Sequence, residues 1–379
     1  RPVAVHYLTA MFPEQDWGRL TGVNASYWKK FAPDFEQRKR NDEQPVWFFR
    51  RLLDGLNPDA SILELASGSG RAIEVLSQEG FTNITGSDIS ADALEMARAN
   101  EVPARELMTL DVLADPIPGV FDAVIANDLF LYFTPAEIDL LLTKIRGALK
   151  DGGRLGFRWA AVSANEDGPQ FHAKDPGTDK ERWVIHASDN FVAEIMSVYG
   201  FRMVGEPVLK EKEPIYGGDG QVDYWYFVTE KMTDAEVLDE TVQTIARIAD
   251  SKIVSVDSMA RLKNAIDSLH ALIERDDSLR VRFNELMEKQ GASAEDFFNF
   301  FTRITLIQAM DRGRPWNFAT KGEKGDGAWA GMLKDHPEFD LKVPISRLRH
   351  FQEMVRVVDL FLSREFGEME RGFYAGMTG

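Results

Sequence analysis

The chain has 379 residues, of which 44% are hydrophobic and 28% charged, and it contains no cysteine. This length predicts two or three domains, and the missing cysteines exclude disulfides, thiolate nucleophiles and cysteine-based metal sites. The 61 acidic and 44 basic residues give a net charge of −17, which disfavours nucleic acid and anionic membranes as partners. The apolar runs are too short for a transmembrane helix. No apolar signal segment opens the sequence, so we expect a cytoplasmic location.

The first 231 residues alternate short apolar strands with helical stretches. The expected strands cover residues 60–65, 83–87, 106–109, 121–126 and 154–159. The helices between them are expected near residues 70–79, 91–100 and 135–149. This alternation predicts an α/β fold, in which a doubly wound and mostly parallel sheet carries helices on both faces.

The rhythm changes after residue 160. Residues 163–179 are expected to form a polar loop, and residues 189–199 a helix that Ser188 caps. Two further strands, 201–210 and 222–227, are joined by a glycine-rich connection that is too short for a crossover helix. They must therefore pair antiparallel, so the sheet is expected to end in an antiparallel hairpin.

Helical periodicity replaces the strand signal from residue 232 to residue 379. Apolar residues recur at helical spacing over residues 259–272 and 345–361, and four phenylalanines crowd into residues 297–301. The phenylalanines indicate either a buried core helix or a surface for self-association or a partner. We expect residues 232–379 to form a mainly α-helical domain for substrate or partner recognition or for dimerisation.

A glycine-rich turn, Glu-Leu-Ala-Ser-Gly-Ser-Gly at residues 64–70, ends the first predicted strand. Its glycines permit a tight turn and a close approach to a ligand, and the helix that follows can receive an anionic group at its N-terminus. Asp88 ends the second strand, where a carboxylate can hold two ribose hydroxyls. The same arrangement occurs in NAD-binding domains. However, Ile73 stands at the third fingerprint position, and the chain lacks a second mononucleotide-binding half.

Five segments in order resemble the class I S-adenosylmethionine-dependent methyltransferases. They are residues 62–70, 86–90, 110–112 with 115–117, 121–127 and 149–155. The resemblance covers about residues 20–230 and does not extend to the C-terminal region. It implies a Rossmann-like sheet of seven strands that ends in a hairpin, S-adenosyl-L-methionine as cofactor and S-adenosyl-L-homocysteine as product.

The resemblance implies a methionine end of the cofactor site in the glycine-rich turn. Glu64, Ala66 and Gly68 would line it, with Gly70 in the same turn, and Asn127 would lie near the amino and carboxylate groups of the cofactor. Many family members have glycine at the position of Ala66, which is a mild departure. The alternative for the two glycines is a tight turn without a ligand.

The resemblance also implies a ribose and adenine end of the site. Asp88 would hold the ribose hydroxyls, and Ile89 would pack against adenine. Asp111 would accept a hydrogen bond from the adenine amino group, and Val112 would supply a backbone contact. The alternatives are a helix cap for Asp88 and an ordinary loop acid for Asp111.

Three residues are candidate general bases. Methyl transfer requires an aligned nucleophile, and a hydroxyl acceptor usually also requires a base or a metal. His172 lies in the loop after residue 159, His186 precedes the helix at residue 189, and Asp128 follows Asn127. A structural role is the alternative for each histidine. No histidine pair has the spacing of metal ligands, so no metal is expected.

Aromatic residues near the beginning of the chain suggest a lid. Residues 1–55 are expected to form an N-terminal helical lid, from which Tyr27 and Trp28 could shield a sulfonium by cation–π contact. The alternative is that these rings pack the first helix. Residues 1–231 thus form the predicted cofactor-binding methyltransferase domain.

The sequence therefore predicts an enzyme that methylates N or O of a small molecule or a peptide, in a biosynthetic pathway. It predicts no nucleic-acid or membrane partner, and a possible homodimer. The alternative is a non-catalytic S-adenosylmethionine-binding scaffold or regulatory subunit, whose helical domain recruits a partner.

Overall fold

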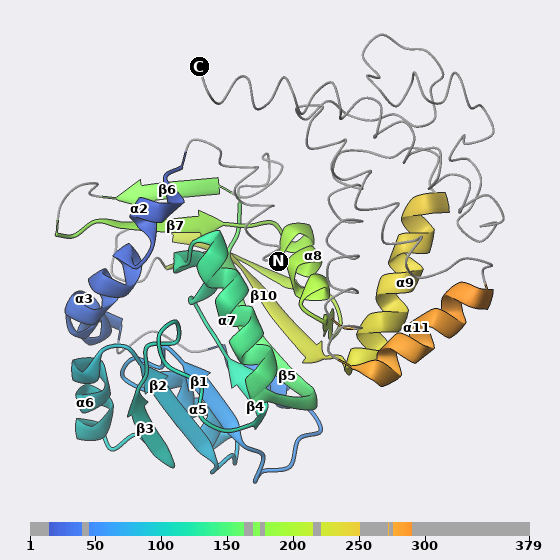
Figure 1. Ribbon diagram of the computed structural model, residues 1–379. Coiled ribbons are helices and arrows are strands. Elements are labelled where there is room, and N and C mark those ends of the chain that lie inside the picture. Colours follow the sequence, from blue (N-terminus) through green and yellow to red (C-terminus); the bar gives the residue numbers. More distant parts are fainter. Residues whose placement is uncertain are drawn as a thin grey trace, which may run out of the picture. The chain divides into compact units, whose positions relative to one another are not determined.

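The computed structural model describes residues 15–39, 45–162, 170–174, 179–214, 221–250, 272 and 276–289 (Figure 1). The chain divides into two compact units, residues 1–233 and residues 234–379. Within the described residues, no helix is long and apolar enough to cross a membrane.

The first unit is built on a mixed sheet in which five strands run parallel. These strands are β1 (Ile62–Leu65), β2 (Ile84–Asp88), β3 (Glu106–Thr109), β4 (Phe121–Ile125) and the first part of β5 (Leu149–Ala160). With β8 (Phe201–Met203) and β10 (Gln221–Lys231), the order is β3-β2-β1-β4-β5-β10-β8. The strand order reverses between β1 and β4. Ligands of doubly wound sheets bind at such a point, outside the carboxyl ends of the strands.

Helices cover both faces of this sheet. The helices described in this unit are α2 (Trp17–Leu20), α3 (Val23–Lys39), α4 (Val46–Leu53), α5 (Arg71–Gln78), α6 (Ala91–Ala99), α7 (Pro135–Ala148) and α8 (Asp189–Val198). Leu63 and Leu65 pack in one buried cluster with α7 and α8, whereas Ile62 packs in another with α4 and α5. Because successive strand residues point to opposite faces, the two clusters lie on opposite sides of the sheet. The predicted doubly wound fold is confirmed.

The sequence predicts a loop at residues 163–179, but residues 170–174 form a strand of a separate antiparallel sheet. It consists of β6 (Gln170–Lys174) and β7 (Arg182–His186). The side chains of β6 are all exposed or half-exposed, so the sequence shows no buried face from which to predict a strand. Phe171 stacks on the buried Trp183, with ring centroids 5.6 Å apart. Pairing with β7 and this ring contact therefore hold β6 in place.

The strand expected at residues 201–210 is in fact two strands, β8 and β9 (Val208–Pro214). Gly205, with a φ of 68°, and Pro207 interrupt the extended chain between them. Both strands pair antiparallel with β10. The expected antiparallel end of the sheet is confirmed, and β10 lies between β5 and β8.

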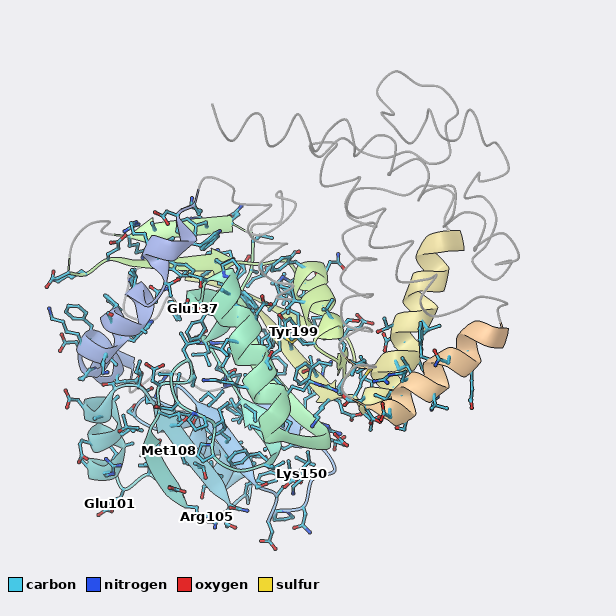
Figure 2. The ribbon with its side chains drawn as sticks, in the orientation of Figure 1. Glu101, Arg105, Met108, Glu137, Lys150 and Tyr199 are labelled. Atoms are coloured by element: carbon cyan, nitrogen blue, oxygen red, sulfur yellow. The ribbon has the colours of Figure 1, made fainter. Side chains whose placement is uncertain are left out.

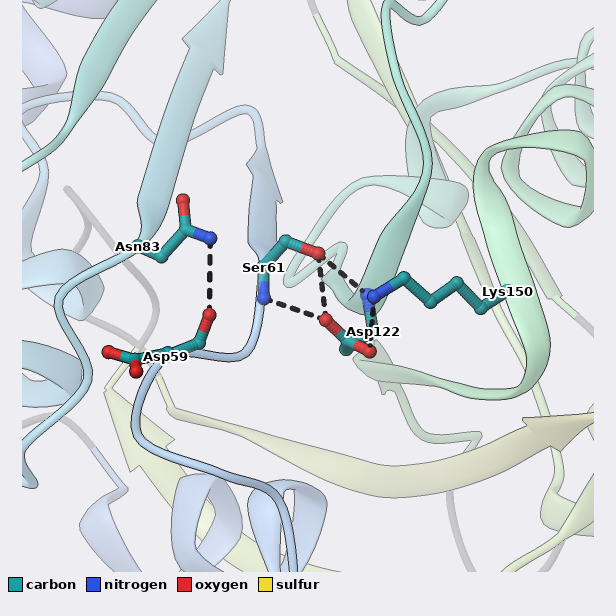
Figure 3. Close-up of polar contacts among 5 residues, drawn as sticks. All are labelled: Asp59, Ser61, Asn83, Asp122 and Lys150. Carbon is teal, nitrogen blue, oxygen red and sulfur yellow. Dashed lines mark hydrogen bonds and ion pairs between the residues drawn. The ribbon is translucent and has the colours of Figure 1, made fainter.

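A polar network ties the amino ends of β1 and β4 together (Figure 3). Asp122 Oδ2 accepts hydrogen bonds from the backbone nitrogen and the Oγ of Ser61, both at 2.8 Å, and Lys150 Nζ donates to Asp122 Oδ1 at 2.7 Å. Partial burial raises the pKa of Asp122, but its bonds to Lys150 and Ser61 outweigh this and lower the pKa below the ordinary value. The network lies at the end of the sheet opposite to the carboxyl ends of its strands.

Hydrogen bonds attach α3 to the core. Glu137, labelled in Figure 2, closes a capping box with Thr134 at the start of α7, and its Oε1 also accepts from Gly22 N at 2.9 Å. Asn24 Nδ2 donates to the backbone oxygens of Tyr132, at 2.7 Å, and of Trp183, at 2.9 Å. The start of α3 is therefore fixed beside the segment that follows β4.

The second unit is described for α9 (Asp234–Asp250), Leu272 and α11 (Asp277–Lys289). Leu238 and Phe283 are buried, and Arg282 forms an ion pair with Asp239 between the two helices. The apolar stripes at 259–271 and 345–361 and the phenylalanines at 297–301 lie outside the described residues. The helical domain as a whole therefore stays a prediction.

Candidate functional site

The loop after β1 turns through three residues in the left-handed region. Ala66, Gly68 and Gly70 have φ values of 56°, 54° and 81°. Glycine adopts this conformation freely, whereas alanine pays about 1 kcal/mol for it. Ser67 N donates to Ser87 O at 2.8 Å, which attaches the loop to the end of β2. Ala66 thus keeps the backbone conformation that glycine would have.

Asp88 ends β2, with its carboxylate fixed by two backbone donors. Oδ2 accepts from Gly68 N at 2.9 Å, and Oδ1 accepts from Ser90 N at 2.8 Å. Burial raises the pKa of Asp88 to about 6, although these hydrogen bonds oppose the shift. Ser90 Oγ is the group that caps α6, by accepting from Ala93 N. The capping alternative for Asp88 is therefore wrong.

Glu64, on β1, carries a buried carboxylate with an unpartnered oxygen. Its side chain is buried, and Oε2 accepts no hydrogen bond. Burial first, and then the charges of Glu36 and Asp88, raise the pKa of Glu64 to about 8. Ser67 Oγ and Asn127 Oδ1 are also buried without a hydrogen-bond partner. Buried polar atoms normally have partners, so these oxygens indicate a site that receives a polar ligand with hydrogen-bond donors.

A cavity of about 1200 Å³, its open mouth included, lies where the carboxyl ends of the central strands meet. It brings together most of the predicted cofactor-binding residues, namely Trp28, Glu64, Ala66, Asp88, Ile89, Asp111, Val112 and Asn127. Gly68 and Gly70 shape the loop beside the cavity without lining it. Tyr27 does not line it either.

Asp111 anchors the turn that follows β3. Its Oδ1 accepts from the backbone nitrogens of Leu113 and Ala114, at 3.0 and 3.2 Å, and its own backbone nitrogen donates to Asp115. The same residue lines the cavity together with Val112. Asp111 therefore anchors this turn and lines the cavity, and its contact with a cofactor stays a prediction.

Aromatic rings of α3 form part of the cavity wall. Trp28 lines the cavity and packs edge-on against Tyr132, with centroids 5.1 Å apart. Tyr27 packs against Trp28 and Phe31, and the guanidinium of Arg182 lies 5.3 Å from its ring centroid. Trp28 is thus placed to contact a ligand, whereas Tyr27 supports Trp28.

Asp128 lines the cavity as one half of a bidentate ion pair with Arg158. Arg158 Nε donates to Asp128 Oδ1 at 2.8 Å and its Nη2 donates to Oδ2. The pair is largely buried, with side-chain exposures of 16% for Asp128 and 4% for Arg158. Arg158 Nη1 also donates to Tyr226 Oη at 3.1 Å, and the guanidinium lies 4.4 Å from the ring centroid of Tyr224. The orientation of the Asp128 carboxylate is therefore fixed from β5 and β10.

The two candidate histidines do not lie in the cavity wall. His172 and His186 belong to β6 and β7, and their ring centroids lie 4.5 Å apart. Burial, with a smaller contribution from His172, lowers the pKa of His186 to about 4. Their role as general bases stays a prediction. No cluster of three or more possible metal ligands occurs in the part of the chain that the structure describes.

Among the residues of the cavity wall that the sequence analysis does not single out are two charged ones, Glu36 and Arg158. Glu36 lies in a polar helix next to several charged residues, so the sequence does not distinguish it from an ordinary surface acid. The sequence does contain a signal for the special role of Arg158, because this residue is the one charged side chain in the apolar strand segment Leu-Gly-Phe-Arg-Trp-Ala. A charge buried in a strand needs a charged partner, and Asp128 is that partner.

The cavity residues fit S-adenosylmethionine in their chemistry. The acidic Glu64 and the unpartnered oxygen of Asn127 suit a cationic ligand with an amino group. The oriented carboxylate of Asp88 suits hydroxyl donors. Ile89 and Val112 provide apolar surface for a flat ring.

Comparison with known proteins agrees with this chemistry. Residues 62–153 match the model of a family described as "Methyltransferase domain". Ribosomal protein L11 methyltransferase of Burkholderia thailandensis is 31% identical over 102 residues, which are 27% of this chain and 32% of the relative. An uncharacterized methyltransferase of Synechocystis is 33% identical over 101 residues, which are 26% of this chain and 46% of that protein. The chain thus spans about a third to a half of the length of these curated relatives.

Solved methyltransferase structures resemble the chain at low sequence identity. The 1,6-didemethyltoxoflavin-N1-methyltransferase of Burkholderia thailandensis has a TM-score of 0.43 and 16% identity, over 55% of this chain and 89% of its own. Magnesium protoporphyrin IX methyltransferase of Synechocystis has a TM-score of 0.41 and 16% identity, over 54% and 96%. The family match shows that residues 62–153 are similar to a methyltransferase domain, and the sheet order and the loop after β1 agree with the Rossmann-like fold expected of such a domain.

Proposed function

We propose that this chain is an enzyme that transfers a methyl group from S-adenosylmethionine to N or O of a small molecule or a peptide, in a cytoplasmic biosynthetic pathway. One observation carries the proposal. The cavity at the reversal of strand order gathers the unpartnered oxygens of Glu64, Ser67 and Asn127 beside the carboxylate of Asp88. When bound there, the cofactor would supply a methyl group activated by its positive sulfonium.

The cofactor's parts correspond to different stretches of the cavity wall. Asp88 would hold the ribose hydroxyls, because its carboxylate is already oriented by two backbone donors. Glu64 and Asn127 would receive the amino group, since each offers a buried oxygen without a partner. Asp111 and Val112, on the turn after β3, would bind the adenine ring.

The acceptor would enter on the side of the cavity where aromatic walls meet the Asp128–Arg158 pair. Trp28 and Phe133 line the same cavity as this pair, and their apolar rings would exclude water that competes with the acceptor. Of the three candidate bases, Asp128 is the one in the cavity wall. It would receive a hydrogen bond from the acceptor's N–H or O–H and orient the lone pair, and Arg158 holds its carboxylate in position.

Titration calorimetry with S-adenosylhomocysteine tests the cofactor site. We expect binding to the full chain and at least about a tenfold loss of affinity in Asp88→Ala, because a buried carboxylate that accepts ligand hydroxyls contributes about 1.5–3 kcal/mol. Asp92→Ala, an exposed acid on the first turn of α6, is the matched control and should bind as the unmodified chain does. Absence of binding, or unchanged affinity in Asp88→Ala, would exclude this site.

Labelled S-adenosylmethionine incubated with the chain and a cell extract tests catalysis separately. Label in a small molecule or peptide supports the enzyme. Binding of the cofactor without label in any molecule would favour the alternative of a non-catalytic scaffold. Two of the curated relatives are ribosomal protein L11 methyltransferases, so peptide acceptors belong among the first fractions examined.

The second unit is proposed to recognise the acceptor or to form a homodimer. All of the residues proposed for cofactor binding precede residue 160, so a chain that ends at Lys231 should keep its affinity for S-adenosylhomocysteine and lose turnover or dimerisation. A folded chain of this length with much weaker cofactor binding would contradict that division of roles.

A further inference from the structure

Glu36, on helix α3, reaches the glycine-rich loop. Its Oε2 accepts from Ser69 N at 3.1 Å and from Ser69 Oγ at 2.7 Å. A Cβ atom added to Gly68 would lie 2.6 Å from the carboxyl carbon of Glu36, so glycine at this position leaves the space that the carboxylate occupies. Glu36 also lines the cofactor cavity.

Glu36 brings a third carboxylate to a wall that already contains two. Glu64 and Asp88 both line the same cavity, and the charge of Glu36 contributes to the raised pKa of each. Arg71 acts in the opposite direction on Glu64. Glu64 is the second, independent sign of a ligand, because its side chain is 94% buried and its Oε2 has no partner. The wall therefore favours a ligand that brings positive charge.

The substrate and the product of the proposed reaction differ in charge. S-adenosylmethionine carries a sulfonium, an ammonium and a carboxylate, for a net charge of +1. S-adenosylhomocysteine has lost the sulfonium and is neutral overall. A nearby fixed carboxylate stabilises the first more than the second, because the attraction exists only for the charge that differs.

Resting on the proposed function, we infer that Glu36 makes this cavity prefer the charged methyl donor to its neutral product. Helix α3 then helps to discriminate between the two states of the cofactor. Preference for the donor also favours release of the product after each methyl transfer. A purely structural contact between Glu36 and Ser69 would instead affect the binding of both ligands alike.

Glu36→Gln tests this inference, with the affinity for both ligands measured by calorimetry on the full chain. Glutamine keeps the length of the side chain and an oxygen that can accept from Ser69, but it removes the charge. We expect the ratio of the Kd for S-adenosylhomocysteine to the Kd for S-adenosylmethionine to fall about three- to tenfold. Asp34→Asn, an exposed position on the same helix, should leave the ratio unchanged.

The possible outcomes separate the inference from the proposed function. If neither ligand binds to the unmodified chain, the proposed function fails. If both bind and Glu36→Gln changes the two affinities by the same factor, or by none, the inference alone is overturned. A second readout is independent of affinity. The pKa of Glu64, followed through the pH dependence of proton release on binding, should decrease in Glu36→Gln and stay constant in Asp34→Asn.

Discussion

Entry of a cationic ligand into the cluster of Glu36, Glu64 and Asp88 should expel a proton from the chain. Burial and the charges of its two neighbours raise the pKa of Glu64 to about 8. At pH 7 about 0.9 of this residue is therefore protonated in the ligand-free chain. A positive ligand stabilises the carboxylate, and a return of the pKa toward its ordinary value of 4.5 leaves almost no proton bound.

Binding of S-adenosylmethionine at pH 7 should thus release about 0.9 proton from Glu64. Asp88, with a pKa of about 6, adds only about 0.1 proton at this pH. Calorimetry in two buffers of different ionisation enthalpy measures this quantity, because the observed heat changes in proportion to the protons that the buffer takes up. Glu64→Gln, which cannot titrate, should reduce the release to less than about 0.3 proton.

Two results would refute this reasoning. The first is a binding heat that does not depend on the buffer, because Glu64 would then keep the same protonation state before and after the ligand binds. The second is an equal release in Glu64→Gln, because the proton would then come from another group.

Three further predictions concern stability. Because the folded pKa of Glu64 is raised to about 8, this residue holds a proton in the folded chain that it has lost in the unfolded chain between pH 4.5 and 8. The melting temperature of the ligand-free chain should therefore fall as pH rises through this window, and less steeply in Glu64→Gln; equal slopes would contradict this. Arg158→Met should lower the unfolding free energy by about 3–5 kcal/mol, because it leaves the largely buried Asp128 unpaired, and adding Asp128→Asn should recover part of the loss in urea unfolding. No recovery in the double variant would show that the ion pair is not the cause. Asp122→Asn should lower the free energy of unfolding, measured in urea, by about 1 kcal/mol. The Kd for S-adenosylhomocysteine should stay unchanged, because Asp122 lies at the opposite end of the sheet. A higher Kd would show that the two ends are coupled.

The sequence predicts well which residues gather at the carboxyl edge of the sheet, because the pattern that places them there is local. The turn at residues 64–70, Asp88 and Asn127 follow directly on apolar strands, and parallel strands present their carboxyl ends at one edge. The positions of Asp111 and Val112 follow in the same way from the third strand. Eight of the predicted cofactor-binding residues line one cavity for this reason.

Contacts between distant segments could not be predicted in the same way. Ser69 and Glu36 are 33 positions apart and meet only because α3 is attached to residues 132, 137 and 183. Arg158 and Asp128 lie on neighbouring segments of the sheet, and their pairing depends on the register of β4 with β5. The sequence does not predict β6, because this strand has no buried face. His172 is therefore expected in a loop, whereas the structure places it on β6, paired with β7.

Under the proposed function, the cavity between Glu64, Asp88 and Asp111 holds the methyl donor. A crystal structure of the full chain with S-adenosylhomocysteine tests it most directly. We expect electron density for the ligand in this cavity, with the ribose hydroxyls within hydrogen-bond distance of Asp88 and the amino group beside Glu64 or Asn127. Ligand density at another place, or an empty cavity in crystals that are saturated with the ligand, would contradict it.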